Sequence, residues 1–154
     1  MRLDNTLGIK NPNRFIPFYM EEKWDDLYFN NDLLHFHDAV RVNGTYKCTG
    51  NNIIIRGMIG TKITLKCYRC LESYEVSFNL CFDEEFSSES IIDHDDRYTF
   101  LNSTIDLNKM VEDTILLAMP MKSICREECK GLCVKCGNNL NLNDCSYCID
   151  ANDN

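Results

Sequence analysis

The chain has 154 residues, of which 44% are hydrophobic and 26% are charged, a composition that excludes wholesale disorder and allows one core of ordinary size. Its net charge of −8 disfavours a simple nucleic-acid coat. It has neither the pattern of a secretion signal nor the roughly 18 consecutive apolar residues of a membrane helix. We therefore expect a cytoplasmic protein that does not associate with membranes.

The predicted core spans residues 34–120 and follows an N-terminal lead-in, residues 1–33, whose periodic signals are weak. Alternating apolar and polar side chains predict strands in the first half of this core, with a bend at Asn43-Gly44. The expected strands cover residues 40–48, 53–59, 62–67 and 74–82. Glycine and asparagine turns between short strands favour an antiparallel sheet that can curl into a partial barrel.

One principal helix is expected after the sheet. Apolar residues recur at helical spacing over residues 107–118, Asp106 is placed to cap the helix, and Pro120 closes it. An acidic loop is expected over residues 87–96. The predicted fold class is therefore α+β.

The remaining residues form a cysteine-rich module, 121–148, and a short tail, 149–154. The module holds six of the ten cysteines and is too polar and too short for a hydrophobic core of its own. A segment of this kind usually needs a metal ion or cross-links to fold. Disulfides are disfavoured in the cytoplasm, so metal binding is the better explanation.

Eight of the cysteines form four close pairs, three with the spacing C-x2-C and one with C-x3-C. Two such turns can supply the four thiolates of a tetrahedral zinc site, and the glycine after Cys136 suits the positive φ that such a turn often needs. We therefore predict one or two zinc ions. The predicted ligands are Cys67, Cys70, Cys125, Cys129, Cys133, Cys136, Cys145 and Cys148.

The grouping of these pairs is only partly determined. The pairs Cys133/Cys136 and Cys145/Cys148 are close in sequence and predict a local site, because short loops cost little closure entropy. The other two pairs are separated by 54 residues, so their union is a long-range prediction. Closure of Cys125/Cys129 on Cys133/Cys136 remains an alternative.

Charge is distributed unevenly along the chain. Residues 36–70 contain six basic residues and one acidic residue, whereas residues 71–96 contain nine acidic residues and no basic one. If the strands are neighbours, their outward side chains form a basic stripe that could hold phosphates and stack a base. The candidate RNA-binding residues are Arg41, Lys47, Lys62, Lys66, Tyr68 and Arg69.

Catalytic signals are weak. His35 and His37 share a strand face but have no third metal ligand nearby, and no phosphate-binding glycine loop is present. By alternation along its predicted strand, Cys48 belongs to the apolar face and is expected in the core. Cys81 belongs to the polar face of its strand and has no assigned role. We expect a protein that is not an enzyme.

Several strings resemble the YceD family, the large ribosomal RNA subunit accumulation proteins. They are CYRCLE at 67–72, IDLNKMVEDTILLAMPMKSIC at 105–125, CKGLCVKCGNNLN at 129–141 and CSYC at 145–148. The resemblance covers about residues 34–148. It implies a non-catalytic role in the accumulation or processing of the large-subunit (23S) ribosomal RNA in bacteria, and it supplies no catalytic residues.

The expected partner is large-subunit ribosomal RNA or a basic large-subunit ribosomal protein. Under the second possibility, the acidic residues of 83–96 would make the chain an escort for that protein. A different class of function also remains, because four thiolates can hold an iron–sulfur cluster or perform thiol redox chemistry.

Overall fold

A computed structural model describes residues 1–29, 32–88, 98–143 and 145. The fold is α+β and mostly antiparallel sheet, as the sequence predicts. Its elements in chain order are β1 (Arg2–Asp4), α1 (Thr6–Lys10), β2 (Ile16–Glu22), β3 (Leu27–Phe29), β4 (Asp32–Phe36), β5 (Val40–Thr49), β6 (Asn52–Lys66), β7 (Ser73–Ser88), β8 (Tyr98–Phe100), β9 (Thr104–Asp106) and α2 (Asn108–Leu117).

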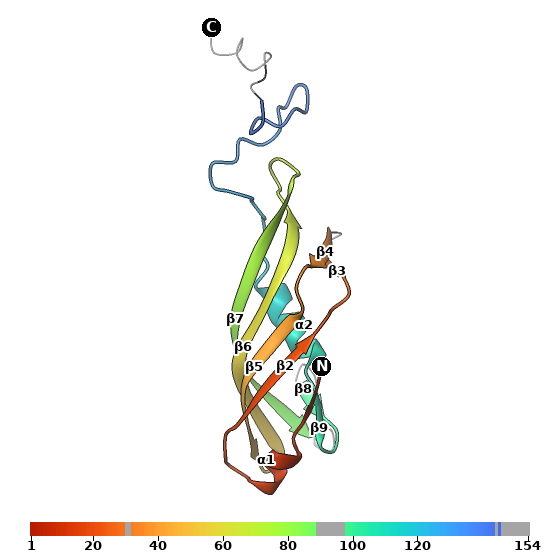
Figure 1. Cartoon of the computed structure of the whole chain (residues 1–154), viewed down its shortest axis with the longest axis vertical. Coiled ribbons are helices and arrows are strands. Elements are labelled where there is room, and N and C mark those ends of the chain that lie inside the picture. Colours follow the sequence, from red (N-terminus) through yellow and green to blue (C-terminus); the bar gives the residue numbers. More distant parts are fainter. Residues whose placement is uncertain (30–31, 89–97, 144, 146–154) are drawn as a thin grey trace.

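The long β6–β7 hairpin organises the molecule (Figure 1). Strand β7 pairs along one edge of β6, from Asn52↔Ser87 to Lys66↔Ser73. Strands β5 and β4 share the other edge, and β2 and β3 extend the sheet from them. The turn of this hairpin lies beyond the rest of the sheet, next to the segment that follows α2.

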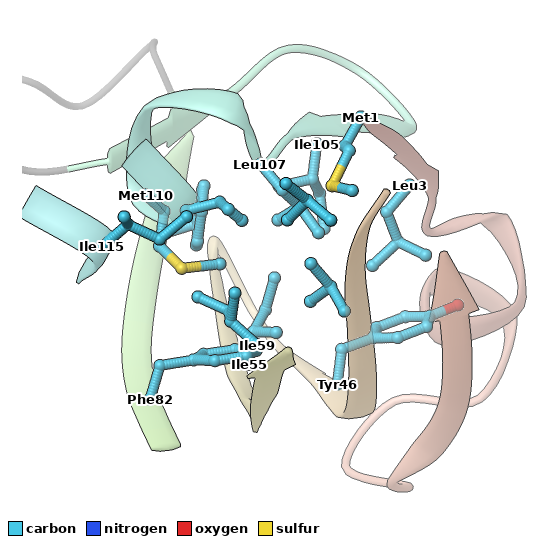
Figure 2. Packing of buried hydrophobic residues seen from close by; sticks show 14 of the residues in the cluster. Met1, Leu3, Tyr46, Ile55, Ile59, Phe82, Ile105, Leu107, Met110 and Ile115 are labelled. Atoms are coloured by element: carbon cyan, nitrogen blue, oxygen red, sulfur yellow. The ribbon is translucent and has the colours of Figure 1, made fainter. Parts of the chain in front are cut away.

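One face of the sheet carries the hydrophobic core, which α2 and the small β1–β9 sheet cover. Figure 2 shows Ile55, Ile59 and Phe82 of the sheet directed toward Met110 and Ile115 of α2. All five side chains are buried. Period-two alternation on the strands and helical spacing on α2 therefore place their apolar residues in one core.

The strand boundaries differ from the sequence prediction at two glycines, Gly44 and Gly60, and a third, Gly57, lies opposite Gly44. The expected bend at Asn43-Gly44 is wrong because β5 runs straight through it, and the expected break at Gly60 is wrong because β6 is continuous. Gly44 and Gly57 are partners in the ladder, and a Cβ on Gly44 would lie 2.0 Å from the Arg56 carbonyl oxygen. Two of these glycines therefore permit a close approach of strands rather than a turn.

The first 33 residues contribute more structure than their sequence pattern predicts. Strand β1 pairs with β9, about a hundred positions later in the chain, and β2 adds an edge to the main sheet. Met1 and Leu3 are buried in the core. The contacts that order this segment are distant in sequence, so local periodicity could not reveal them.

Two further expectations concern the barrel and the helix. The partial barrel does not form, because the paired strands described here make an open sheet with no closing ladder. The principal helix is close to its predicted place, and Asp106 Oδ1 accepts a hydrogen bond of 3.0 Å from the Asn108 amide at its start.

Of the expected acidic loop, residues 87–88 belong to β7 and 89–96 are outside the described residues, as is the expected tail. None of the described helices is long and apolar enough to span a membrane.

Candidate metal centre

The first C-x2-C turn joins β6 to β7. The Leu71 amide donates to the Cys67 carbonyl at 2.9 Å, and the Cys67 amide donates to the Glu72 carbonyl at 2.8 Å. These bonds fold residues 67–72 so that both cysteine side chains are on the same side of the turn, and both are buried. Leu71 takes a positive φ of 61° to complete it.

The second C-x2-C turn, at Cys133 and Cys136, has the same construction. The Gly137 amide donates to the Cys133 carbonyl at 2.8 Å, and the Cys133 amide donates to the Asn138 carbonyl at 2.8 Å. Gly137 has a φ of 74°, which confirms the positive φ expected after Cys136. Two unrelated parts of the chain therefore adopt one turn that presents two sulfurs.

The first thiol group consists of Cys67, Cys70, Cys125 and Cys129. Their four sulfurs all lie within 4.8 Å of one another. The Cys67 and Cys129 sulfurs are 3.8 Å apart, as are those of Cys70 and Cys125. The structure thus joins the two pairs that are separated by 54 residues of sequence, which was the long-range prediction.

The second thiol group contains Cys133, Cys136 and Cys145. Their sulfurs also lie within 4.8 Å of one another, with 3.3 Å between Cys136 and Cys145 and 3.5 Å between Cys145 and Cys133. Cys148, the predicted fourth ligand, is outside the described residues. Closure of Cys125/Cys129 on Cys133/Cys136 is not what the geometry shows, because each pair belongs to a different group.

The spacing of the sulfurs fits a single tetrahedral ion. Metal–sulfur bonds of about 2.3 Å place the sulfurs of such a site about 3.8 Å apart. None of the nine described cysteines is in a disulfide. A four-iron cluster binds each thiolate to a different iron and needs a wider set of sulfurs. The donor set and its spacing therefore favour a single thiolate-bound metal ion over a four-iron cluster.

The thiols of the first group differ widely in pKa, so one of them ionises easily and another resists ionisation. Burial raises the pKa of Cys67, but backbone hydrogen bonds from Cys125, Cys70 and Arg69 outweigh it and lower that pKa to about 6. Burial and the neighbouring thiols raise the pKa of Cys125 to about 12. Close thiolates repel one another, and a bound divalent cation would allow all four to ionise.

Asn141 connects the two thiol groups, and the sequence pattern did not single it out. Its Nδ2 donates to the Cys129 sulfur at 3.4 Å, and its Oδ1 accepts from the Lys130 amide at 2.9 Å. The Asn141 hydrogen bond is a cause that lowers the pKa of Cys129, against burial, which raises it. The loop between Cys136 and Cys145 thus supports a ligand of the other group, an arrangement typical of metal sites.

The predicted basic stripe lies on the outer face of the sheet, but carboxylates flank it. Arg41 Nε is 3.1 Å from Glu21 Oε1 of β2, and Lys62 Nζ is 3.3 Å from Glu75 Oε2 of β7. The antiparallel register places these acidic residues on the same face as the cations. At Arg41 and Lys62 the stripe therefore presents ion pairs rather than unpaired positive charge.

The other candidate RNA-binding residues have different surroundings. Lys47 Nζ lies 4.9 Å from the centre of the Phe15 ring. Arg69 donates to the carbonyls of Glu127 and Cys129 at 3.2 and 3.1 Å, so it ties the first turn to the post-helix segment. Lys66 and Tyr68 line a groove next to the first thiol group. Contact of any of these residues with RNA stays a prediction.

Among the described residues, Cys48, Cys81 and the histidines His35 and His37 take no part in either thiol group. Cys48 is buried in the core, as expected, and Cys81 is exposed. His35 Nδ1 is 2.6 Å from Asp26 Oδ2, and His37 contacts Thr64. These contacts hold the histidines on the sheet surface.

The fold and the two thiol groups define an α+β protein whose cysteine-rich module packs on the end of its longest hairpin. Residues 55–154 match the family described as large ribosomal RNA subunit accumulation protein YceD. The matched range is well over half of the chain and contains both thiol groups. This chain belongs to the YceD family.

Relatives share this region at modest identity. A chloroplastic YCED homolog 1 of Zea mays, named as a large ribosomal RNA subunit accumulation protein, is 29% identical over 62% of this chain and 44% of its own length. Its counterpart in Arabidopsis thaliana is 32% identical over 58% of this chain and 37% of its own length. An uncharacterized Mycobacterium leprae protein is 27% identical over 58% of this chain and 43% of its own length. The chain thus spans less than half the length of these relatives. No solved structure matches it.

Proposed function

We propose that this protein is a non-catalytic binding factor in the accumulation or processing of large-subunit ribosomal RNA. The observation that carries the proposal is the family match over residues 55–154, which includes most of β6, all of β7 and α2, and all eight paired cysteines. The names of the maize and Arabidopsis relatives state a role in large ribosomal RNA subunit accumulation for those proteins. Because this chain covers less than half of each of them, their role is transferred here as a proposal.

The absence of catalysis is part of the same proposal. The strongly shifted thiol pKa values belong to the first thiol group, and their causes are burial, backbone hydrogen bonds and the neighbouring thiols rather than a catalytic partner. Each thiolate that binds a structural metal is occupied and cannot serve as a nucleophile. The chemistry of the site therefore supports binding rather than turnover.

We further propose that each thiol group holds one zinc ion, with Cys148 completing the second. In the first site, Cys67 and Cys70 come from the β6–β7 turn, and Cys125 and Cys129 come from the segment after α2. An ion there would join the sheet to the cysteine-rich module. Structural zinc sites with four protein ligands have no open position for substrate, which agrees with a scaffolding role.

Metal analysis of the purified full chain tests the zinc proposal. The expected result is colourless protein with two zinc ions per chain, since each group supplies one tetrahedral site. Brown protein that absorbs visible light and contains iron and sulfide would instead support the iron–sulfur alternative. Thiols that react quantitatively without metal would support a redox protein.

Depletion of the protein in its host tests the proposed function. The expected result is a lower ratio of large-subunit to small-subunit ribosomal RNA, restored by the wild-type chain and not by Cys67→Ser. An unchanged ratio would contradict the proposal. Large-subunit RNA is the favoured partner, and the alternative, a basic ribosomal protein, predicts that this protein co-purifies with the chain in the absence of RNA.

A further inference from the structure

A groove of about 440 Å³ lies between the end of the sheet and the segment that follows α2. Leu34 and Leu65 contribute buried apolar surface to it, and Met119 and Met121 line it from the other segment. Its volume is within the range of about 300–1,000 Å³ that small-molecule sites occupy. The groove could therefore accept a flat group such as a nucleobase.

Among the described residues that line the groove, the ionisable groups are His35, Lys66 and the phenol of Tyr68, and none is a carboxylate. The outer face of the sheet differs, because ion pairs neutralise Arg41 and Lys62 there. Lys66 lies opposite Ser73 in the β6–β7 ladder, and among the described residues it has no ion pair of the kind that Lys62 makes with Glu75. The groove therefore has positive character at its rim, although Asp26 pairs with His35 at its outer side.

Tyr68 is an exposed aromatic side chain at the rim of this groove. It is 70% exposed, and Lys122 Nζ lies 5.9 Å from the centre of its ring. The Tyr68 amide donates to the Ser123 carbonyl at 2.7 Å, and Ser123 Oγ donates to the Lys66 carbonyl at 2.6 Å. These bonds hold the two lysines and the ring on adjoining segments, so the platform is assembled before a ligand arrives.

We infer that this groove binds an unstacked nucleotide of single-stranded RNA. The base stacks on Tyr68, and Lys66 and Lys122 contact the flanking phosphates. Single-stranded loops and bulges are the parts of an RNA whose bases can leave the helix and stack on aromatic side chains. This inference rests on the proposed function and names the kind of RNA segment that the protein recognises.

Charge favours RNA over a peptide as the occupant. A groove with two lysines at its rim and no carboxylate in its lining is complementary to phosphate. A basic ribosomal protein would meet like charge at this position. Such a protein would be attracted instead to the carboxylates of β7 on the outer face, which already pair with the sheet's own cations.

Fluorescence anisotropy with the zinc-loaded full chain and a short, labelled, unstructured single-stranded RNA tests the inference. We expect Tyr68→Ala to weaken binding by about 5- to 150-fold, which is the usual effect of losing one base-stacking aromatic. Tyr68→Trp should retain affinity. Lys122→Ala should reduce the slope of log affinity against log salt by about 0.7, as for one lost phosphate contact on a single strand.

Two matched controls accompany these variants. Val134 is the residue of the second turn that corresponds to Tyr68, and it is 99% exposed, so Val134→Ala should bind as the wild type does. Arg41→Ala removes a cation that Glu21 already pairs, and it should have little effect. Unchanged zinc content and circular dichroism of Tyr68→Ala would show that the loss is local.

Wild-type affinity of Tyr68→Ala, equal binding of double-stranded RNA, or an equal loss in Arg41→Ala would each overturn the inference. Release of a basic ribosomal protein by Tyr68→Ala without a change in RNA affinity would also overturn it. The proposed function fails separately, if depletion leaves the ribosomal RNA ratio unchanged. If the Tyr68→Ala variant fully restores that ratio in the depleted host, the proposed function stands and this inference is wrong.

Discussion

The two thiol groups use the same turn but differ in how the rest of the molecule supports it. In the first group Cys67, Cys70 and Cys129 are buried, and the ligands come from segments 54 residues apart. In the second group Cys136 is exposed, and eight residues separate the inner cysteines of its two pairs. A short loop can bring ligands together by itself, whereas the first group requires the folded sheet and helix.

The loop of the second group contacts the first group directly. Residues 138–143 lie between the ligands of the second group, and Asn141 of that loop donates to Cys129 of the first. Asn139 Nδ2 also donates to Glu72, beside Cys70, at 3.4 Å. The local site therefore orders a loop that completes the surroundings of the long-range site.

The largest expected effect is that of Cys67→Ser. This substitution removes a ligand of the first site, and a structural zinc contributes about 10 kcal/mol or more of apparent binding energy. We expect the zinc content to fall from two ions to one per chain and the segment after α2 to become sensitive to limited proteolysis. Metal analysis and proteolysis measure both changes.

Cys81→Ser is the matched control for Cys67→Ser, because Cys81 is exposed on the outer face of β7 and belongs to neither group. It should leave zinc content and proteolysis unchanged. Equal effects of the two substitutions would show that the first thiol group does not hold a metal.

An intermediate effect is expected for Asn141→Ala. Loss of its hydrogen bond to Cys129 should reduce the zinc affinity of the first site by about 10- to 100-fold, the usual effect of removing a residue that supports a ligand. Competition with a chromophoric chelator measures this affinity. Asn143→Ala, in the same loop, is the control, since no side-chain contact to either thiol group is described for Asn143. Equal zinc affinity of Asn141→Ala and this control would show that Asn141 does not support the first site.

The smallest effects are expected from exchanging the residues after each C-x2-C turn. Leu71 and Gly137 occupy the same position with φ of 61° and 74°, a conformation that costs an ordinary L-residue about 1–2 kcal/mol. Gly137→Leu should lower the free energy of unfolding and Leu71→Gly should raise it, each by somewhat less than this amount, because glycine has more freedom than leucine in the unfolded chain. Denaturant titration of the zinc-loaded variants measures both. Opposite signs would mean that side-chain packing outweighs backbone strain at these turns.

Local patterns predicted several elements of the fold because their causes are local. Alternation over residues 74–82 and helical spacing over 107–118 identified parts of β7 and α2, since one buried face is enough to produce each pattern. Gly44 and Gly60 misled the prediction. A glycine in a strand and a glycine in a turn look alike in sequence, and the close approach of Gly44 to Gly57 depends on which strands pair.

The features of the candidate site also divide into those with local causes and those that depend on contacts between distant segments. The sequence by itself determined the ligand type, the C-x2-C turns and the need for a positive φ at Gly137, because these depend on neighbouring residues. Only the tertiary structure decided that Cys67/Cys70 meets Cys125/Cys129, that carboxylates flank Arg41 and Lys62, and that Asn141 supports Cys129. Those contacts join segments distant in sequence, and strand register and helix packing set them without leaving a periodic signal in the chain.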